Sequence, residues 1–290
     1  MIDIIRRLSG IEHAAQDLYG DAARYFRETH PPLSRFLDEQ SCDEAGHDRV
    51  MGLAERLVQG DPAHFTTPLG LDEHTEARIL APFDSIRADL SAGTLTAGPM
   101  FAGLVEAESS EWNDFFVFVV ETLKRDGREF QEAASRIQQH LRKIEVFMDA
   151  YPEYREHLDV LRRAPRVWTP AVLVVEDSQP VVELLQSVLA RVYVVDTAED
   201  GAVALRKASG RHYDVILSDI DMPVMNGIEF SLRLSEVIPG VAERFVFYTG
   251  SLQHMDQCRR KGLRCLQKPA SLVEVRRAVA DVAERDRFAP

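Results

Sequence analysis

The hydrophobic pattern of this 290-residue chain changes at about residue 170, and this change constrains the fold more than any other feature. Before it, apolar residues recur with the 3.6-residue period of amphipathic helices, over 1–29, 33–59, 100–124 and 128–149. After it, short runs rich in β-branched residues alternate with amphipathic segments, a rhythm typical of strands alternating with helices. The sequence therefore predicts two domains of different class.

The first half predicts an all-α four-helix bundle. Its second and third helices are separated by a long connection, 60–99, which is interrupted by prolines and glycines and holds a short amphipathic piece around 84–91. Four long helices with one long crossover describe a known type of bundle. We expect the bundle to occupy 1–150 and a charged linker to occupy 151–169.

The last part, 170–290, predicts an α/β domain with a doubly wound, five-stranded parallel sheet. Five strand-like runs alternate with five helical segments: AVLVV at 171–175, VYVVD at 192–196, YDVILSD at 213–219, RFVFYTG at 244–250 and RCLQ at 264–267. In such sheets the chemistry collects at the carboxyl ends of the strands. Residues at those ends are therefore the candidates for a functional site.

Composition argues against several classes of partner. The net charge of −13 disfavours binding to a phosphate backbone, so we expect no nucleic acid. The longest apolar run, FFVFVV at 115–120, is too short to span a membrane. Three cysteines without a CxxC pair suit a reducing compartment. We expect a cytoplasmic protein that does not bind membranes.

The strand ends of the second domain carry a specific set of polar residues. Glu176 and Asp177 end the first strand, Asp219 the third and Thr249 the fourth, while the fifth runs into Lys268. Carboxylate oxygens that converge in a partly hydrated pocket suit Mg²⁺. A lysine could neutralise an anion carried on an aspartate, and a hydroxyl could hydrogen-bond its oxygens.

The motifs VLVVEDS, LSDIDMPVMNG, FVFYTG and LQKP resemble the flavodoxin-like receiver domain of two-component response regulators, over 171–288. The resemblance implies that a histidine kinase phosphorylates Asp219. It also implies that Mg²⁺ is held by Asp177 and Asp219, aided by Glu176 and the backbone carbonyl of Asp221. By the same resemblance, Lys268 pairs with the phosphoryl group and Thr249 moves toward it.

One position departs from the receiver pattern. The family usually has tyrosine or phenylalanine three residues before the lysine, as an output switch coupled to the threonine. This chain has Cys265 there. Phosphorylation should survive the change, but an aromatic switch cannot operate at that position.

The helical half repeats a spacing of glutamate and histidine. Glu44 and His47, in CDEAGHD, stand three apart and so share one helix face. Glu12 precedes Glu44 by 32 residues, and Glu108 precedes position 137 by 29, with His140 three residues further on. The two halves of the bundle therefore have the same plan. Burying several carboxylates without cations would be very costly, which favours metal if they are interior.

This plan resembles the ferritin-like superfamily, nearest its rubrerythrin branch, over about 1–150. The resemblance implies a diiron or dimanganese site whose ligands are Glu12, Glu44, His47, Glu108 and His140. The departure is Ile137, where the pattern expects glutamate. A neighbour such as Glu106 or Glu111 could replace the missing carboxylate, and the alternative is a structural bundle that binds no metal.

These observations predict a two-component signalling protein that joins a phosphorylatable receiver to a metal-binding sensor or effector bundle. The partners would be a sensor histidine kinase and a downstream protein, and the resemblance implies a homodimer. Enzyme activity stays open: one alternative is a phosphorylation-regulated diiron oxidase or peroxidase, and another is a metal-free, phosphorylation-dependent adaptor. A histidine phosphotransfer bundle is a weaker rival, because neither HDRVM nor HLRKI has the HxxKG pattern.

Overall fold

The computed structural model describes the chain except for residues 62–72, 109–110, 124, 126, 152–167 and 284–290. It divides into two compact units: a helical unit of Met1–Arg125 with Arg136–Val167, and a second unit of Asp126–Ser135 with Trp168–Ala289. Most of the predicted linker, 152–167, lies outside the described residues. No helix in the described ranges is long and apolar enough to cross a membrane.

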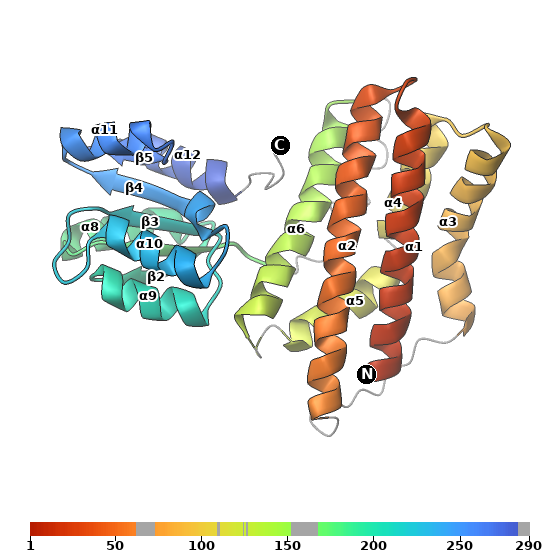
Figure 1. The fold of residues 1–290 in the computed structure, drawn as a ribbon, viewed down its shortest axis with the longest axis horizontal. Helices are drawn as coiled ribbons and strands as arrows, with labels where there is room; N and C mark the ends of the chain where they lie inside the picture. Colours follow the sequence, from red (N-terminus) through yellow and green to blue (C-terminus); the bar gives the residue numbers. More distant parts are fainter. Residues whose placement is uncertain (62–72, 109–110, 124, 126, 152–167, 284–290) are drawn as a thin grey trace. The chain divides into compact units, whose positions relative to one another are not determined.

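The helical region contains α1 (Ile2–Phe26), α2 (Pro31–Gly60), α3 (Glu73–Ala92), α4 (Ala97–Glu108), α5 (Glu111–Leu123) and α6 (Arg128–Asp149). Helices α1 and α2 form a long antiparallel pair, and α6 runs beside α2 (Figure 1). The hydroxyl of Ser34 donates to the carbonyl of Ala23 at 2.8 Å, and that of Ser41 donates to the carbonyl of Gln16 at 2.9 Å. These bonds fix the register of the pair.

The prediction of an all-helical first half is confirmed, but the connection predicted at 60–99 contains a longer helix than expected. The piece predicted at 84–91 is part of α3, a 20-residue helix that contains Pro82. The helix predicted over 100–124 is described as α4 and α5, and residues 109–110 between them lie outside the described residues. Tertiary burial of Ile79, Phe83 and Ile86 explains α3, because it outweighs the weak local helix signal around a proline.

The second unit is a five-stranded parallel sheet, as the sequence predicts, and its strand order is β2-β1-β3-β4-β5. The strands are β1 (Ala171–Val175), β2 (Val194–Ala198), β3 (Val215–Asp219), β4 (Phe245–Thr249) and β5 (Cys265–Gln267). The helices are α8 (Gln179–Leu189), α9 (Gly201–Gly210), α10 (Gly227–Val237), α11 (Leu252–Arg260) and α12 (Leu272–Ala283), with a short 3-10 helix at Val241–Arg244. The second strand begins two residues later than predicted.

Helices cover both faces of the sheet (Figure 1). Residues of α8 and α12 pack with Val172, Val174 and Leu217 on one face. Residues of α9, α10 and α11 pack with Leu173 and Phe247 on the other. Because successive strand residues point to opposite faces, β1 and β3 are buried along their whole length. Their carboxyl ends therefore emerge together at one edge of the sheet.

Gly227 allows the first turn of α10 to approach that edge. A Cβ atom at this position would lie 2.1 Å from the carbonyl oxygen of Asp219 and 2.8 Å from the hydroxyl of Ser218. Asn226 caps the helix from the preceding position, where its side chain accepts a hydrogen bond from the amide of Glu229 at 2.8 Å. A glycine is needed here because any side chain would displace the end of β3.

Candidate functional site

At the carboxyl edge of the sheet, Lys268 joins two carboxylates. Its ammonium nitrogen lies 2.7 Å from Oε2 of Glu176 and 2.7 Å from Oδ2 of Asp219. Both carboxylates are buried, whereas Asp177 is exposed. Oxygens of Glu176, Asp177 and Asp219 lie within 4.8 Å of one another. The structure therefore brings together the three predicted carboxylates and the predicted lysine.

Burial and charge oppose each other at this edge. Burial raises the pKa of Glu176, although the nearby Lys268 works to lower it. For Lys268, burial works to lower the pKa, but the hydrogen bonds with Asp219 and Glu176 outweigh it and raise the pKa. Oδ1 of Asp219 accepts from the amides of Ile220 at 2.6 Å and Asp221 at 3.2 Å. Asp219 is thus held in one orientation by the two backbone amides that follow it and by the Lys268 ammonium.

Thr249 is fully buried at the end of β4, and its hydroxyl donates to Oδ2 of Asp221 at 3.1 Å. The amide of Ser251 donates to the same hydroxyl at 3.1 Å. Nδ1 of His254, in the first turn of α11, lies 3.2 Å from Oδ2 of Asp221. Sequence reasoning assigned only the backbone of Asp221 and missed His254, because no strand end or spacing marks that histidine.

Cys265 lies on β5 and packs against the core that contains Cys258. Burial, reinforced by the neighbouring Cys258 thiol, raises the pKa of Cys265 to about 12. A thiol that stays protonated is a poor nucleophile. This environment favours a packing role for Cys265 over redox sensing.

The parallel sheet and the Asp219–Lys268 edge define the class of the second unit, and comparison with known families agrees. Residues 172–280 match the response regulator receiver domain. This segment is therefore a receiver domain, the kind of domain that two-component signalling uses. The match does not extend to the N-terminal helical region, which has no family assignment.

Part of this chain is also similar to parts of known proteins. The sensor histidine kinase RcsC of Escherichia coli (strain K12) is 31% identical over 118 residues, which cover 40% of this chain and 12% of that protein. Protein-glutamate methylesterase/protein-glutamine glutaminase 3 of Hahella chejuensis is 41% identical over 70 residues, or 23% of this chain and 20% of that protein. The matched segment is thus a small part of these relatives.

Two solved structures are also similar to part of this chain. Chemotaxis protein CheY4 of Vibrio cholerae is 29% identical and covers 40% of this chain and 99% of its own, with a TM-score of 0.36. The receiver domain of the sensor histidine kinase PA1611 from Pseudomonas aeruginosa PAO1, with a magnesium ion in its active site cleft, is 27% identical. It covers 41% of this chain and all of its own, with a TM-score of 0.36.

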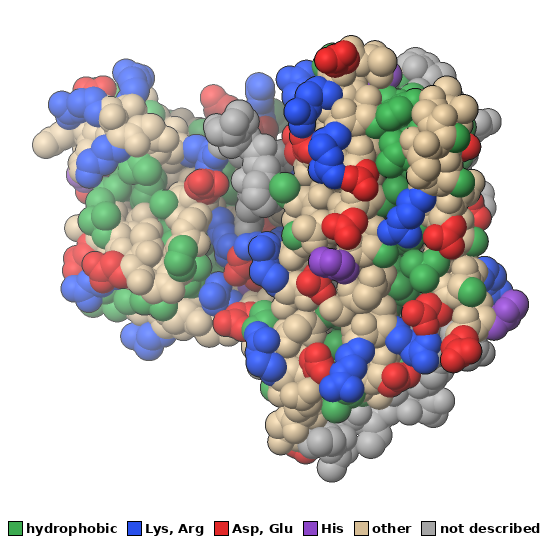
Figure 2. All heavy atoms as spheres, turned by 45° about the vertical axis from the view of Figure 1, so that its right-hand side comes forward, with side chains coloured by type: hydrophobic (Ala, Val, Ile, Leu, Met, Phe, Trp, Pro, Cys, Tyr) green, Lys and Arg blue, Asp and Glu red, His purple; other side chains and the backbone are tan. Residues whose placement is uncertain are grey.

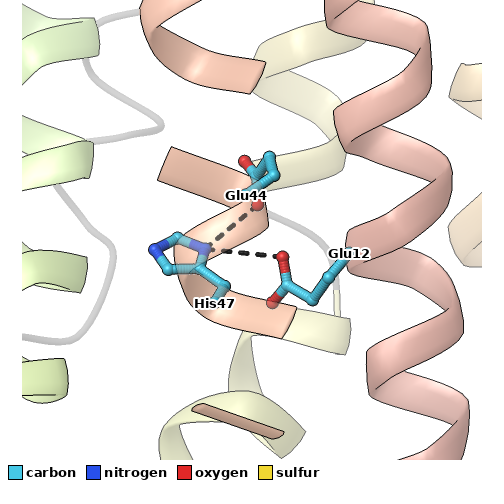
Figure 3. Close-up of side chains that lie close together, drawn as sticks. All are labelled: Glu12, Glu44 and His47. Atoms are coloured by element: carbon cyan, nitrogen blue, oxygen red, sulfur yellow. Dashed lines mark hydrogen bonds and ion pairs between the residues drawn. The ribbon is translucent and has the colours of Figure 1, made fainter. Parts of the chain in front are cut away.

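The helical unit contains a second cluster of functional side chains, which is buried. Glu12 extends from α1 toward Glu44 and His47 on α2 (Figure 3). Nδ1 of His47 lies 3.0 Å from Oε2 of Glu44 and 3.4 Å from Oε2 of Glu12. Glu12 and Glu44 are both 0% exposed. Figure 2, by contrast, shows acidic and basic side chains interspersed over an outer face of the helices.

His140 on α6 completes the cluster from the other side. Its Nε2 lies 3.4 Å from Oε1 of Glu44 and 3.3 Å from Oε1 of Glu108. The His140 and His47 rings meet edge to face with centroids 5.0 Å apart. Two groups with metal-ligand spacing result, one of Glu12, Glu44 and His47 and one of Glu44, Glu108 and His140. All five residues implied by the ferritin-like resemblance therefore come together, with Glu44 shared.

The missing carboxylate is not supplied by the nearest described candidate. Ile137 is buried, one turn before His140 on α6. Glu106 is exposed, so it does not replace a ligand at this position. The side chain of Glu111 lies outside the described residues.

Sequence reasoning missed two residues behind His140. Nδ1 of His140 lies 3.4 Å from Oδ2 of Asp43, and the ammonium of Lys143 lies 2.9 Å and 3.2 Å from the two oxygens of Asp43. Burial works to raise the pKa of Asp43, but His140 and Lys143 together lower it to about 2. Asp43 and Lys143 thus hold the ring so that Nε2 faces Glu44 and Glu108. Asp43 could have been found because it precedes Glu44, and Lys143 because it follows His140 by three residues.

The cluster is suited to cations. Within the described part of the chain, the buried side-chain atoms without a hydrogen bond of good geometry all lie in this core: both oxygens of Glu12, the hydroxyl of Tyr19, both amide atoms of Gln40, Oε1 of Glu44 and Nε2 of His140. Burying such groups without partners is costly. Carboxylate oxygens and imidazole nitrogens are ligands for iron, manganese and zinc. The donor set therefore fits a divalent transition metal.

Electrostatics support the same interpretation. Burial, reinforced by Glu44, raises the pKa of Glu12 well above its usual range. Burial works to lower the pKa of His47, but Glu12 and Glu44 outweigh it and raise it to about 10. Without a metal, protons on these groups balance the carboxylates, and cations would take their place.

Proposed function

We propose that this chain is a two-component signalling protein in which Asp219 accepts a phosphoryl group and the helical unit is a metal-binding sensor or effector. The observation that carries the first part is the Lys268 ammonium, which bridges Asp219 and Glu176 beside the exposed carboxylate of Asp177. The second part rests on the two buried ligand groups that share Glu44.

The receiver residues divide the work of phosphoryl transfer. Glu176, Asp177, Asp219 and the carbonyl of Asp221 would hold Mg²⁺, which when bound neutralises charge on the carboxylates and the incoming group. Lys268 is placed to pair with the phosphoryl oxygens after transfer to Asp219. Thr249 already donates to a side chain at this edge, so it can exchange that partner for a phosphoryl oxygen.

The receiver part is tested by incubating the protein with acetyl phosphate and Mg²⁺. We expect labelling of the wild type and none of Asp219→Asn. Asp256→Asn is the matched control, because that aspartate is exposed on α11 and its carboxylate pairs with Arg259 on the same helix. Persistent labelling of Asp219→Asn, with the same yield as the control, would reject Asp219 as the acceptor.

The metal part is tested by elemental analysis after anaerobic loading with iron(II) or manganese(II). We expect bound metal in the wild type and a large loss in Glu44→Gln, because Glu44 belongs to both ligand groups. Glu55→Gln on the same helix is the control, since it loses only a surface ion pair with Arg6. Absence of metal from the wild type would leave the metal-free adaptor as the function.

A second candidate, a phosphorylation-regulated oxidase or peroxidase, is favoured by one observation. The two ligand groups share Glu44, which is the arrangement that two adjacent cations require. This candidate predicts more than one metal per chain and consumption of oxygen or peroxide by the reduced, loaded protein. Two metals without any such turnover would leave the sensor role.

A further inference from the structure

The interior of the helical unit contains a buried amide that neither ligand group uses. Gln40 is 0% exposed, and neither its amide nitrogen nor its oxygen has a hydrogen-bond partner. It lies one turn before Glu44 on α2, in the same buried stripe that runs from Leu37 to His47. An amide that is buried without a partner is costly, because it loses its hydrogen bonds to water and gains none in the protein. Such a residue at an interior position points to a polar ligand.

Tyr19 lies at the same level of the interior on α1. The register of the helix pair, set by the Ser41–Gln16 and Ser34–Ala23 bonds, places Tyr19 opposite the α2 turn that contains Gln40. Its side chain is fully buried, and its hydroxyl lies near Glu108 and Glu44. Two donors, an amide and a phenol, therefore lie beside the carboxylates.

The sum of the charges on the metal ions and their ligands indicates whether a further ligand would be an anion or a cation. Two divalent cations would bring four positive charges, while the three carboxylates of the ligand groups bring three negative ones and ligating imidazoles are neutral. Asp43 does not offset the difference, because its charge is already paired with Lys143. Ile137 offers an apolar side chain one turn from His140. One positive charge therefore remains in a site closed to bulk water.

From these observations we infer that the helical unit binds a small anion beside the metal pair, held by the Gln40 amide and the Tyr19 hydroxyl. The inference rests on the proposed metal site. The anion supplies the missing negative charge and accepts hydrogen bonds from both donors.

The test uses the full-length protein loaded anaerobically with cobalt(II) and azide as the probe anion. Bound metal per chain is counted first, and azide is then titrated while the cobalt absorption bands are followed. We expect two metals per chain and saturable azide binding. Gln40→Leu should retain both metals and weaken azide binding tenfold or more, which is about 1.4 kcal/mol for each factor of ten.

Two further variants sharpen the result. Gln59→Leu, at an exposed position on the same helix, should bind azide like the wild type. Ile137→Glu should retain metal and lose azide binding, because the added carboxylate supplies the missing charge.

The failures are distinguishable. No bound metal, or a single ion per chain, removes the excess positive charge and overturns the inference together with the dinuclear site. Two bound metals with azide affinity unchanged in Gln40→Leu overturn the inference alone and leave the metal site standing.

Discussion

The pairing of Asp43 with His140 and Lys143 predicts a specific loss of stability in Asp43→Asn. The side chain of Asp43 is 12% exposed, so solvent screens its interactions little. Its pKa is lowered from 3.8 to about 2. At about 1.4 kcal/mol per pKa unit, this difference corresponds to about 2 kcal/mol of stability at neutral pH.

The pH dependence has a defined sign. A carboxyl group whose pKa is depressed in the folded protein contributes its stability above its unfolded pKa and loses it as the pH falls through the folded value. The difference between wild type and Asp43→Asn should therefore be constant from about pH 5 upward and should shrink between about pH 4 and pH 2.

The measurement is calorimetric or chemical unfolding of the metal-free protein across this range, with the helical transition resolved from that of the receiver. Asp38→Asn is the matched control, because Asp38 is an exposed aspartate on the same helix. We expect the control to change stability by less than about 0.5 kcal/mol. An equal effect in both variants, or a difference that persists undiminished to pH 2, would refute the assignment of the stability to this charge pairing.

Two further predictions concern the receiver. Gly227→Ala should destabilise the receiver by about 1–3 kcal/mol, since the new Cβ would meet the carbonyl of Asp219 at 2.1 Å. Gly210→Ala is the control in thermal unfolding, because the space around its Cβ is open. Equal effects of the two substitutions would contradict the packing argument. Lys268→Met should lower the rate of labelling by acetyl phosphate at least tenfold and strengthen Mg²⁺ binding in calorimetry, because the ammonium no longer occupies Oδ2 of Asp219. Labelling that matches the exposed control Lys261→Met would show that the cation is dispensable.

The receiver site was predictable because its residues are fixed to strand ends. A buried strand of period two ends where the apolar run ends, so Asp219 and Thr249 could be placed at one edge from the sequence alone. The approach of Lys268 followed from the parallel order of the strands. The contact between His254 and Asp221 was not predictable, because it depends on how the first turn of α11 packs over the loop.

The residues that come together in the helical site were predictable from the sequence, but their surroundings were not. Glu44 and His47 share a helix face at any tertiary arrangement, since the three-residue spacing decides it. The approach of Lys143 to Asp43, 100 residues apart, requires α6 to pack against α2. Helix α3 likewise depends on tertiary burial, because its own pattern around Pro82 is weak.

The sequence by itself determined the two classes of structure, the alternation of strands and helices in the receiver and the residue types at both sites. Hydrophobic periodicity and residue spacing are local properties of the chain, so secondary structure and shared helix faces can be predicted from them without the tertiary structure. Only the tertiary structure decided that Glu12, Glu44 and Glu108 are buried together and that Asp43 is paired with Lys143. Burial and long-range pairing set the free energy of keeping charged carboxylates in the interior. Because that free energy is unfavourable without cations, these glutamates and histidines form a candidate metal centre.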